Sequence, residues 1–200
     1  MVEAPQAEIR SVTAVMFTAM VSREARVPQE EALEGELRAE HARLVRELLP
    51  RQGGREVKAT EDGFLLAFDG GLPAVRFGVA LQDALRCYNQ QAPAGRQMAL
   101  RIGVHVGPVV SHEGDLFGEG VNLAARIEAL ARPGTLYVSE AVMRQVDGHA
   151  LPPALRFRRN ALKGLRLPVE VFRIEPREAP PRPRLLARVR SLLAPKRARG

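Results

Sequence analysis

The sequence predicts an α+β fold in which helices cover one face of a mostly antiparallel sheet. The first observation is the order of elements: strand, helix, hairpin, helix, strand, helix, strand, short helix and a final pair of strands. Strands joined by tight turns pair antiparallel, and the helices between them cover the sheet. The second observation is a chain of 200 residues with 46% hydrophobic residues. This is enough to bury the core of one domain.

The first half of the predicted domain contains a strand, a helix and a hairpin. The strand is a β-branched and apolar run, and the helix carries leucines at helical spacing until Pro50 ends it. Two glycines mark a turn before the hairpin. The predicted elements are a strand over Ser11–Val21, a helix from Pro28 to Leu49, and hairpin arms over Arg55–Lys58 and Gly63–Phe68 that meet around Thr60–Asp62.

The second half begins with a helical pattern, which is followed by a long strand with alternating apolar residues. The run VNLAARIEAL again has helical periodicity, with Leu123, Ala124 and Ile127 on the side that faces a core. The predicted elements are a helix over Leu72–Tyr88, a strand over Met98–Val110, a helix from Val121, a strand over Thr135–Ser139, a short helix from Glu140, and a closing strand pair, FRRNALKG and LPVEVFRI, around Lys163–Gly164.

Composition divides the chain into three parts. Residues 1–10 form an N-terminal extension, residues 11–175 the domain, and residues 176–200 a Pro/Arg-rich linker with a basic amphipathic tail. Eight basic residues and one acidic residue stand from Arg177 onward, so this tail carries the whole net charge of +7. The tail either contacts a membrane surface or a partner protein, or folds over its own domain.

Composition also excludes several classes of protein. Cys87 is the only cysteine, which excludes an intrachain disulfide and a cysteine-based metal site. No apolar run approaches the roughly 20 residues that span a bilayer, and the acidic N-terminus lacks the layout of a signal peptide. The domain has no Trp and few aromatic residues, which disfavours nucleic acid as a partner. We expect a cytoplasmic protein.

The segment GDLFGEGVNLAARIEAL, from Gly114 to Leu130, carries the clearest chemical pattern. It places Asp115, Asn122 and Arg126 at spacings of seven and four residues. On a helix, Asn122 and Arg126 lie one turn apart and project from the same side. An amide beside a forked cation suits a polyanionic group such as a triphosphate. The alternative, on periodicity alone, is an amphipathic surface helix with a solvated arginine.

Five separated blocks of the sequence resemble segments of a known protein family. The blocks are VTAVMFTAMV, REVKATEDGFLLAF, LRIGVHVGPVV, GDLFGEGVNLAARIEALARPGTLYVSE and LKGLRLPVEVFRI. In order and spacing they resemble the catalytic domain of class III adenylate and guanylate cyclases, from about Ser11 to Ile174. The form GDLFGEGVN is most similar to bacterial members. The resemblance implies a ferredoxin-like nucleotidyl cyclase fold and active sites formed between two head-to-tail domains.

The resemblance also implies roles for individual residues. Lys58 and Asp115 match the pair that reads the purine edge, and a lysine donor with a carboxylate acceptor suits adenine better than guanine. Asn122 matches the residue that positions the ribose, and Arg126 the residue that stabilises the charged transition state. Lys163, in LKG, matches the basic residue that contacts the triphosphate. The implied substrate is ATP or another purine triphosphate.

The metal-binding part of the pattern is degraded. The family uses two Mg²⁺ or Mn²⁺ ions, and Asp62 matches the second of the two carboxylates that hold them. The motif of the first, F-x-D-[IL]-x-G-[FY]-[ST], reads here FTAMVSRE, so Ala19 stands at the aspartate position. Ser22 replaces the glycine of the phosphate loop, while Glu24 and Glu61 add negative charge. Because both ions serve the reaction, loss of the bridging carboxylate compromises the two-ion site.

Two classes of function remain open. The first is an adenylate cyclase-type phosphorus-oxygen lyase that converts ATP to cyclic AMP and pyrophosphate. It acts either as a homodimer with impaired intrinsic activity or as the purine and transition-state half of a heterodimer with an intact cyclase domain. The second is a catalytically silent pseudo-cyclase, a nucleotide-binding or dimerising regulatory module in cyclic nucleotide signalling. A third, a nucleic-acid-binding protein, rests on the basic tail alone.

The four histidines suggest no further chemistry. His105 is expected in the core or at a dimer interface, and His41 and His149 at the surface. His112 lies near the expected site, but no Cys or His stands at ligand spacing from it, so a zinc site is not predicted.

Overall fold

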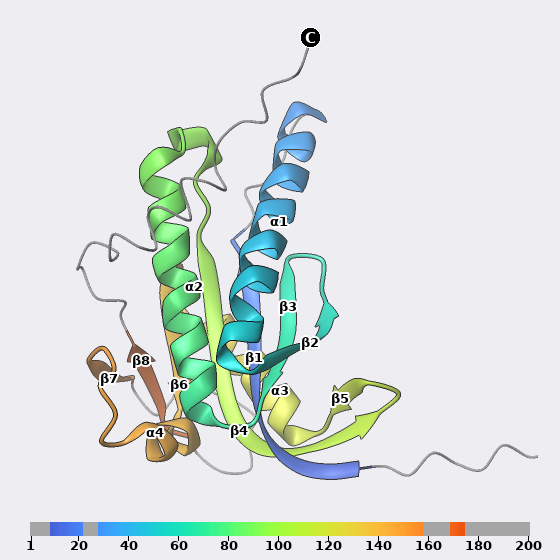
Figure 1. Ribbon diagram of the computed structural model, residues 1–200, viewed down its shortest axis with the longest axis vertical. Helices are drawn as coiled ribbons and strands as arrows, with labels where there is room; N and C mark the ends of the chain where they lie inside the picture. Colours follow the sequence, from blue (N-terminus) through green and yellow to red (C-terminus); the bar gives the residue numbers. More distant parts are fainter. Residues whose placement is uncertain (1–8, 22–27, 158–168, 175–200) are drawn as a thin grey trace, which may run out of the picture.

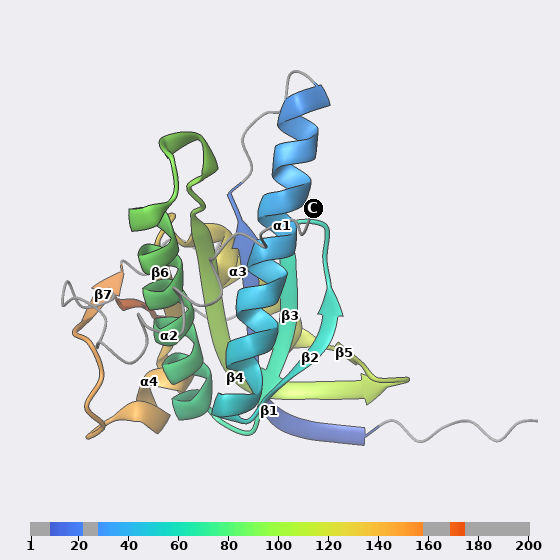
Figure 2. The same cartoon turned by 45° about the horizontal axis from the view of Figure 1, so that its top comes forward.

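A computed structural model of the chain describes residues 9–21, 28–157 and 169–174 (Figures 1 and 2). Its helices are α1 (Pro28–Leu48), α2 (Gly71–Gln91), α3 (Glu119–Leu130) and α4 (Glu140–Val146), with short 3-10 turns η1 (Leu49–Gln52) and η2 (Ala94–Arg96). Its strands are β1 (Ile9–Met20), β2 (Gly54–Ala59), β3 (Gly63–Phe68), β4 (Leu100–His112), β5 (Asp115–Phe117), β6 (Thr135–Ser139), β7 (Ala154–Phe157) and β8 (Val171–Ile174). Ser22, Glu24, Lys163 and the predicted tail over residues 176–200 lie outside the described residues.

The eight strands form a sheet in the order β2-β3-β1-β4-β6-β8-β7, and β5 pairs with the end of β4. Among the described strands, β4 and β6 run parallel and every other pair is antiparallel. The predicted α+β class and the mostly antiparallel sheet are therefore confirmed. Strand β1 lies between β3 and β4, so the ends of these three strands meet at one edge of the sheet (Figure 1).

Three helices, α1, α2 and α4, cover one face of this sheet (Figures 1 and 2). Their inward stripes, with Leu37, Leu44 and Val45 on α1, pack against strand residues such as Met16 and Ile102. No helix in the part of the chain that the structure describes is long and apolar enough to cross a membrane.

His41 belongs to the inward stripe of α1, and its predicted surface position is wrong. Its side chain is 2% exposed and its ring lies edge-on against Phe64, with centroids 5.3 Å apart. It follows Leu37 by four residues, so helical spacing directs it toward the sheet. The predicted surface position of His41 rested on its residue type and not on the helical periodicity. His149 is exposed, as expected.

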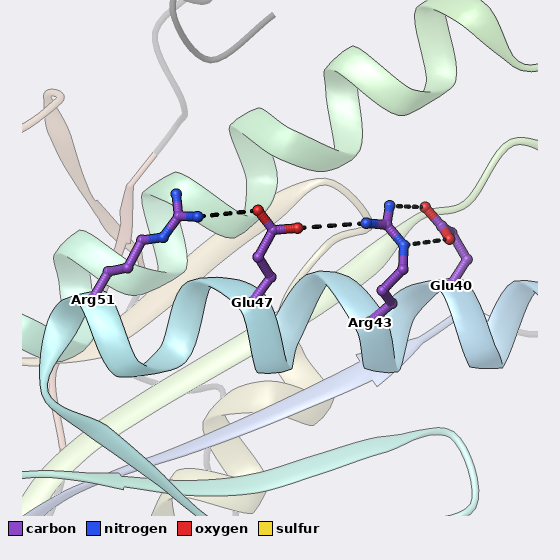
Figure 3. A network of polar contacts seen from close by, with 4 residues as sticks. All are labelled: Glu40, Arg43, Glu47 and Arg51. Carbon is purple, nitrogen blue, oxygen red and sulfur yellow. Dashed lines mark hydrogen bonds and ion pairs between the residues drawn. The ribbon is translucent and has the colours of Figure 1, made fainter. Parts of the chain in front are cut away.

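The outer side of α1 carries a ladder of ion pairs (Figure 3). Arg43 contacts Glu40 at 2.5 Å and Glu47 at 3.4 Å, and Arg51 reaches Glu47 at 3.1 Å. Pairs three or four residues apart on a helix contribute about 0.3–0.5 kcal/mol each. The ladder therefore supports a helix whose inner side is already held by the core.

Helix α3 packs against the opposite face of the sheet, which corrects the prediction that helices cover one face only. Its buried residues Leu123, Ala124 and Ile127 contact strand residues such as Val15 and Tyr137 rather than the layer of α1 and α2. The reason lies in the strands, because β3 is buried at all six positions. A strand with apolar residues on both sides needs cover on both faces.

Two strands differ from the prediction. The short strand β5 was not predicted, and it pairs with β4 through Val110, Ser111 and His112. Strand β7 covers Ala154–Phe157 and so includes three residues before the predicted strand FRRNALKG, most of which lies outside the described residues. The partner strand β8, within LPVEVFRI, is confirmed and pairs antiparallel with β7.

Candidate functional site

Lys58 and Asp115, which are 57 positions apart in the sequence, are in direct contact. Lys58 extends from the edge strand β2, and Asp115 opens β5 directly after the turn at Glu113 and Gly114. Both turn residues have positive φ, 49° and 83°, which reverses the chain tightly and starts β5 beneath β2. The Lys58 ammonium donates to Asp115 Oδ2 at 2.5 Å, and the two side chains are 48% and 28% exposed.

The Asp115 carboxylate is held in its ionised form. The hydrogen bond from Lys58 is the main cause, and the backbone amide of Leu116 adds a second bond to Oδ1 at 2.7 Å. Together they lower the pKa of the Asp115 carboxyl against the opposing effect of burial. The exposed ring of Phe117 lies beside the pair, 6.0 Å from the Lys58 ammonium. The arrangement offers a cationic donor and an anionic acceptor side by side at the surface.

Asn122 and Arg126 lie one turn apart on α3, and both are exposed. The helix begins just after Gly118, where the chain turns out of β5 with a φ of 112°. The Gly118 carbonyl accepts a hydrogen bond from the backbone N–H of Asn122 at 3.2 Å. Within the described residues neither side chain is engaged in a hydrogen bond or an ion pair. The structure thus keeps an amide and a guanidinium free on the same side of α3, as the spacing predicts.

Asp62 lies in the β2–β3 turn at the end of β1. The Thr60 hydroxyl donates to Asp62 Oδ1 at 3.2 Å and accepts the Gly63 amide at 3.0 Å, while the Asp62 carbonyl accepts the Met20 amide at 2.7 Å. Gly63 is needed here, because a Cβ at this position would lie 1.6 Å from the Thr18 carbonyl oxygen. The turn is therefore pressed against β1.

Ala19 is beside this turn, paired with Gly63 on β3 and with Arg101 on β4. It is 5% exposed and brings no ligand atom. The structure thus places the two predicted metal positions, Ala19 and Asp62, at the same corner of the sheet. In the described residues no group of three or more His, Cys, Asp or Glu side chains is arranged to hold a metal ion. The residues present do not fit a two-ion site.

Sequence reasoning missed two charged residues at this corner. Arg101 on β4 and Glu128 on α3 form an ion pair, with Nε and Oε1 2.9 Å apart. Burial raises the pKa of the Glu128 carboxyl, Arg101 opposes that shift, and the nearby charge of Asp62 adds to it. A charged residue at an inward-facing position of an otherwise apolar strand was the available signal for Arg101.

Three of the remaining candidate residues are not described by the structure, and the others lie apart or at the surface. Lys163, Ser22 and Glu24 lie outside the described residues, and Glu61 is exposed in the turn beside Asp62. His105 is half-buried, with Nδ1 2.9 Å from the Ser139 hydroxyl oxygen, and burial lowers its pKa to about 4. Within the described residues no hydrogen bond or ion pair joins the Lys58–Asp115 pair to the corner that holds Asp62.

Comparisons with known proteins identify the family. The sequence profile of the adenylate and guanylate cyclase catalytic domain matches residues 6–172. A putative adenylate cyclase 3 of Rhizobium meliloti is 37% identical over 125 residues, 62% of this chain and 21% of that protein. An adenylate cyclase of Streptomyces griseus is 30% identical over 145 residues, 72% of this chain and 34% of that protein.

Solved structures share the fold over most of the chain. The crystal structure of an adenylate/guanylate cyclase/hydrolase from Silicibacter pomeroyi aligns with a TM-score of 0.75 at 28% identity, over 86% of this chain and 99% of that one. By contrast, the chain spans only 21% and 34% of the length of the two curated relatives named above. Its similarity to them concerns one domain. The chain belongs to the family of class III adenylate and guanylate cyclase catalytic domains.

Proposed function

We propose that this chain supplies the adenine-reading and transition-state residues of an adenylate cyclase site, while a partner domain supplies the metal carboxylates. The reaction would be conversion of ATP to cyclic AMP and pyrophosphate across the interface of two domains. The observation that carries the proposal is an asymmetry. The Lys58–Asp115 pair is formed and, among the described residues, Asn122 and Arg126 have no side-chain partner, whereas Ala19 stands where a metal ligand is expected.

The chemistry of Lys58 and Asp115 supports adenine as the base. The Watson–Crick edge of adenine offers a ring nitrogen that accepts a hydrogen bond and an amine that donates one. An ammonium donor beside a carboxylate acceptor matches that order, whereas guanine presents a donor and a carbonyl acceptor at the same places. Because the pKa of the Asp115 carboxyl is lowered, this carboxylate is an acceptor throughout the neutral pH range.

Asn122 and Arg126 support the other half of the role. An amide can donate to and accept from ribose oxygens, which would fix the sugar for attack of its 3′-hydroxyl on the α-phosphorus. A guanidinium one helical turn away would stabilise the negative charge that develops on the phosphorus oxygens, and it keeps its proton at any working pH. Lys163, outside the described residues, would contact the triphosphate.

The corner of the sheet that holds Ala19 and Asp62 explains why the proposal includes a partner domain. In this chemistry divalent ions acidify the attacking hydroxyl and neutralise the leaving pyrophosphate. In a homodimer both sites would receive the corner that contains Ala19, so both would be incomplete. In a heterodimer with an intact domain, one of the two sites would combine complete metal ligands with Lys58, Asp115, Asn122 and Arg126.

A second candidate function is a silent regulatory module. The buried Ala19 favours it, because this side chain leaves the corner without one of the two metal carboxylates. Such a module would bind a nucleotide, or another cyclase domain, without turnover in any combination. It differs from the first proposal only in the site that this chain would form with an intact partner domain, which would stay inactive.

Restoring the missing carboxylate tests the proposal. We expect the purified chain to form little cyclic AMP from Mn²⁺-ATP, and Ala19→Asp combined with Ser22→Gly to raise the rate by about 10²-fold or more. The matched control is Ala19→Asn with Ser22→Gly, which has the same size without the charge. A double variant that binds ATP yet stays as inactive as this control would contradict the proposal.

A further inference from the structure

Strand β2 contains one residue more than regular pairing with β3 can accommodate. Between Gly54 and Ala59, the pairing with β3 skips Val57. This extra residue forms a β-bulge between Glu56 and Lys58. A bulge increases the local twist of a strand and re-aims the side chains beside it. The place of the bulge along β2 therefore decides which side chains of this strand face β5.

The observed position of the bulge puts Val57 and Lys58 on the same side of the sheet. Lys58 pairs with Leu65 and reaches Asp115 on β5, while Val57 packs against the apolar cluster that contains Leu65 and Leu116. In a regular strand two neighbouring residues point to opposite faces. A bulge at another place in β2 would therefore turn either Val57 or Lys58 away from β5. The contact between the two strands depends on where the extra residue lies.

Helix α1 holds the residue directly before the bulge. Arg46 Nε donates to Glu56 Oε2 at 2.9 Å, and Arg46 Nη2 donates to Glu56 Oε1 at 2.8 Å, so the ion pair is bidentate. The Arg46 guanidinium also lies over the Phe64 ring of β3, 5.5 Å from its centroid. A bidentate pair has a fixed planar geometry, and among surface ion pairs it is the kind that holds its partners in place. Glu56 is therefore kept on the side of the sheet that α1 covers.

The hairpin turn limits the bulge on its other side. The Thr60 amide donates to the Gly63 carbonyl at 2.9 Å, which closes the turn directly after β2. Val57 and Lys58 are thus confined between this turn and the ion-paired Glu56. With both limits in place, the extra residue of β2 stays at Val57 and both confined residues face β5.

We infer that Arg46 and Glu56 are positioning residues for Lys58. Their ion pair keeps the bulge of β2 at Val57 and so directs the Lys58 ammonium to Asp115. The inference rests on the proposed function, because it concerns the pair that we propose reads adenine. Arg46 and Glu56 act on base recognition through Lys58 and need no contact of their own with the nucleotide.

Nuclear magnetic resonance of the Asp115 side-chain carboxyl tests the position of Lys58 without nucleotide. The hydrogen bond from Lys58 is the main cause of the lowered pKa of this carboxyl, so Arg46→Met should raise that pKa toward its ordinary value. Glu56→Gln breaks the same ion pair from the other side and should have the same effect. Arg43→Met is the matched control, because it removes ion pairs that lie within α1 and should leave the pKa of Asp115 unchanged. Thermal denaturation verifies that each variant is folded.

Calorimetry of ATP binding then measures whether the ion pair acts through Lys58. Arg46→Met should weaken ATP binding by about five-fold in the otherwise unmodified chain, and it should cause no further loss where Lys58→Met is already present. An equal loss in both backgrounds would overturn the inference, because the ion pair would then act on the domain as a whole. An unchanged pKa of Asp115 in folded Arg46→Met or Glu56→Gln would also overturn it. If the pKa rises but neither Lys58→Met nor Arg46→Met alters ATP binding, the positioning of Lys58 is supported and the proposed reading of adenine fails.

Discussion

At the scale of single residues, the contact between Lys58 and Asp115 is the feature most open to test. The pair is partly exposed, and such ion pairs contribute about 0.2–1 kcal/mol to folding. Substitution should therefore leave the chain folded while it removes the contacts proposed for adenine. This separation of binding from stability makes the pair a clean target.

We predict that Lys58→Met and Asp115→Asn each weaken ATP binding by about 10- to 100-fold, because each loses one or both hydrogen bonds to the base. Isothermal titration calorimetry measures the affinity, and thermal denaturation verifies the fold. Arg55→Met changes another exposed cation of β2 and should bind ATP as the unmodified chain does. Equal weakening in all three variants would mean that the loss reflects general charge rather than base recognition.

Sequence alone was sufficient to identify the residues on regular elements. Asn122 and Arg126 share one side of α3 because helical spacing determines their relation, and Ala19 is beside Asp62 because both belong to recognisable blocks. Arg101 and Glu128 were missed, since their contact depends on the register of β1 with β4 and on the close packing of α3 against Gly103. A linear pattern does not contain such a long-range contact.

At the scale of elements, the attachment of α1 to the sheet is expected to depend on pH. Burial lowers the pKa of His41 to about 4, with a small opposing effect of Asp62. Its Nε2 is buried without a hydrogen-bond partner among the described residues. In the unfolded chain the pKa is near 6.5, so between pH 6.5 and about 4 the unfolded state takes up a proton that the folded state refuses.

We therefore predict that the free energy of unfolding falls as the pH drops through this window, by about 2 kcal/mol between pH 7 and pH 5 for His41. Urea denaturation at the two pH values measures the difference. His41→Leu should reduce the pH dependence by that amount, while the exposed His149→Leu should leave it unchanged. An unaltered pH dependence in a folded His41→Leu chain would refute this reading of α1.

Sequence periodicity predicted the boundaries of the long helices, but it did not predict which face of the sheet each helix covers. Helices α1 and α2 lie within a few residues of their predicted ranges, because leucine spacing and proline positions are local signals. The opposite placement of α3 was missed, although the uninterrupted apolar run of β3 carried the information. The three-residue strand β5 has too few residues for any periodicity, and its register comes from β4.

At the scale of the whole molecule, the fold class and the family could be predicted from the sequence, because five separated blocks constrain the order of elements. The proposed division of labour in the active site was expected from Ala19 and the matching residues, and it stays a prediction because it concerns a second polypeptide. The described residues contain the Lys58–Asp115 pair, which we propose reads the base, and no group of three or more His, Cys, Asp or Glu side chains that could hold a metal ion. A head-to-tail arrangement of two such domains would place unlike halves together, which makes the identity of the partner decisive.

Complementation between two defective copies of this chain measures that claim most directly. The mate carries Ala19→Asp, Ser22→Gly and Arg126→Ala, so it offers metal carboxylates without the transition-state arginine, whereas the unmodified chain offers the arginine alone. We predict that the mixture forms cyclic AMP about 10²-fold faster than the sum of the separate chains, and that Asp62→Ala in the mate abolishes the gain. A mixture whose heterodimers are verified by sedimentation, yet which forms no more cyclic AMP than its parts, would contradict the account.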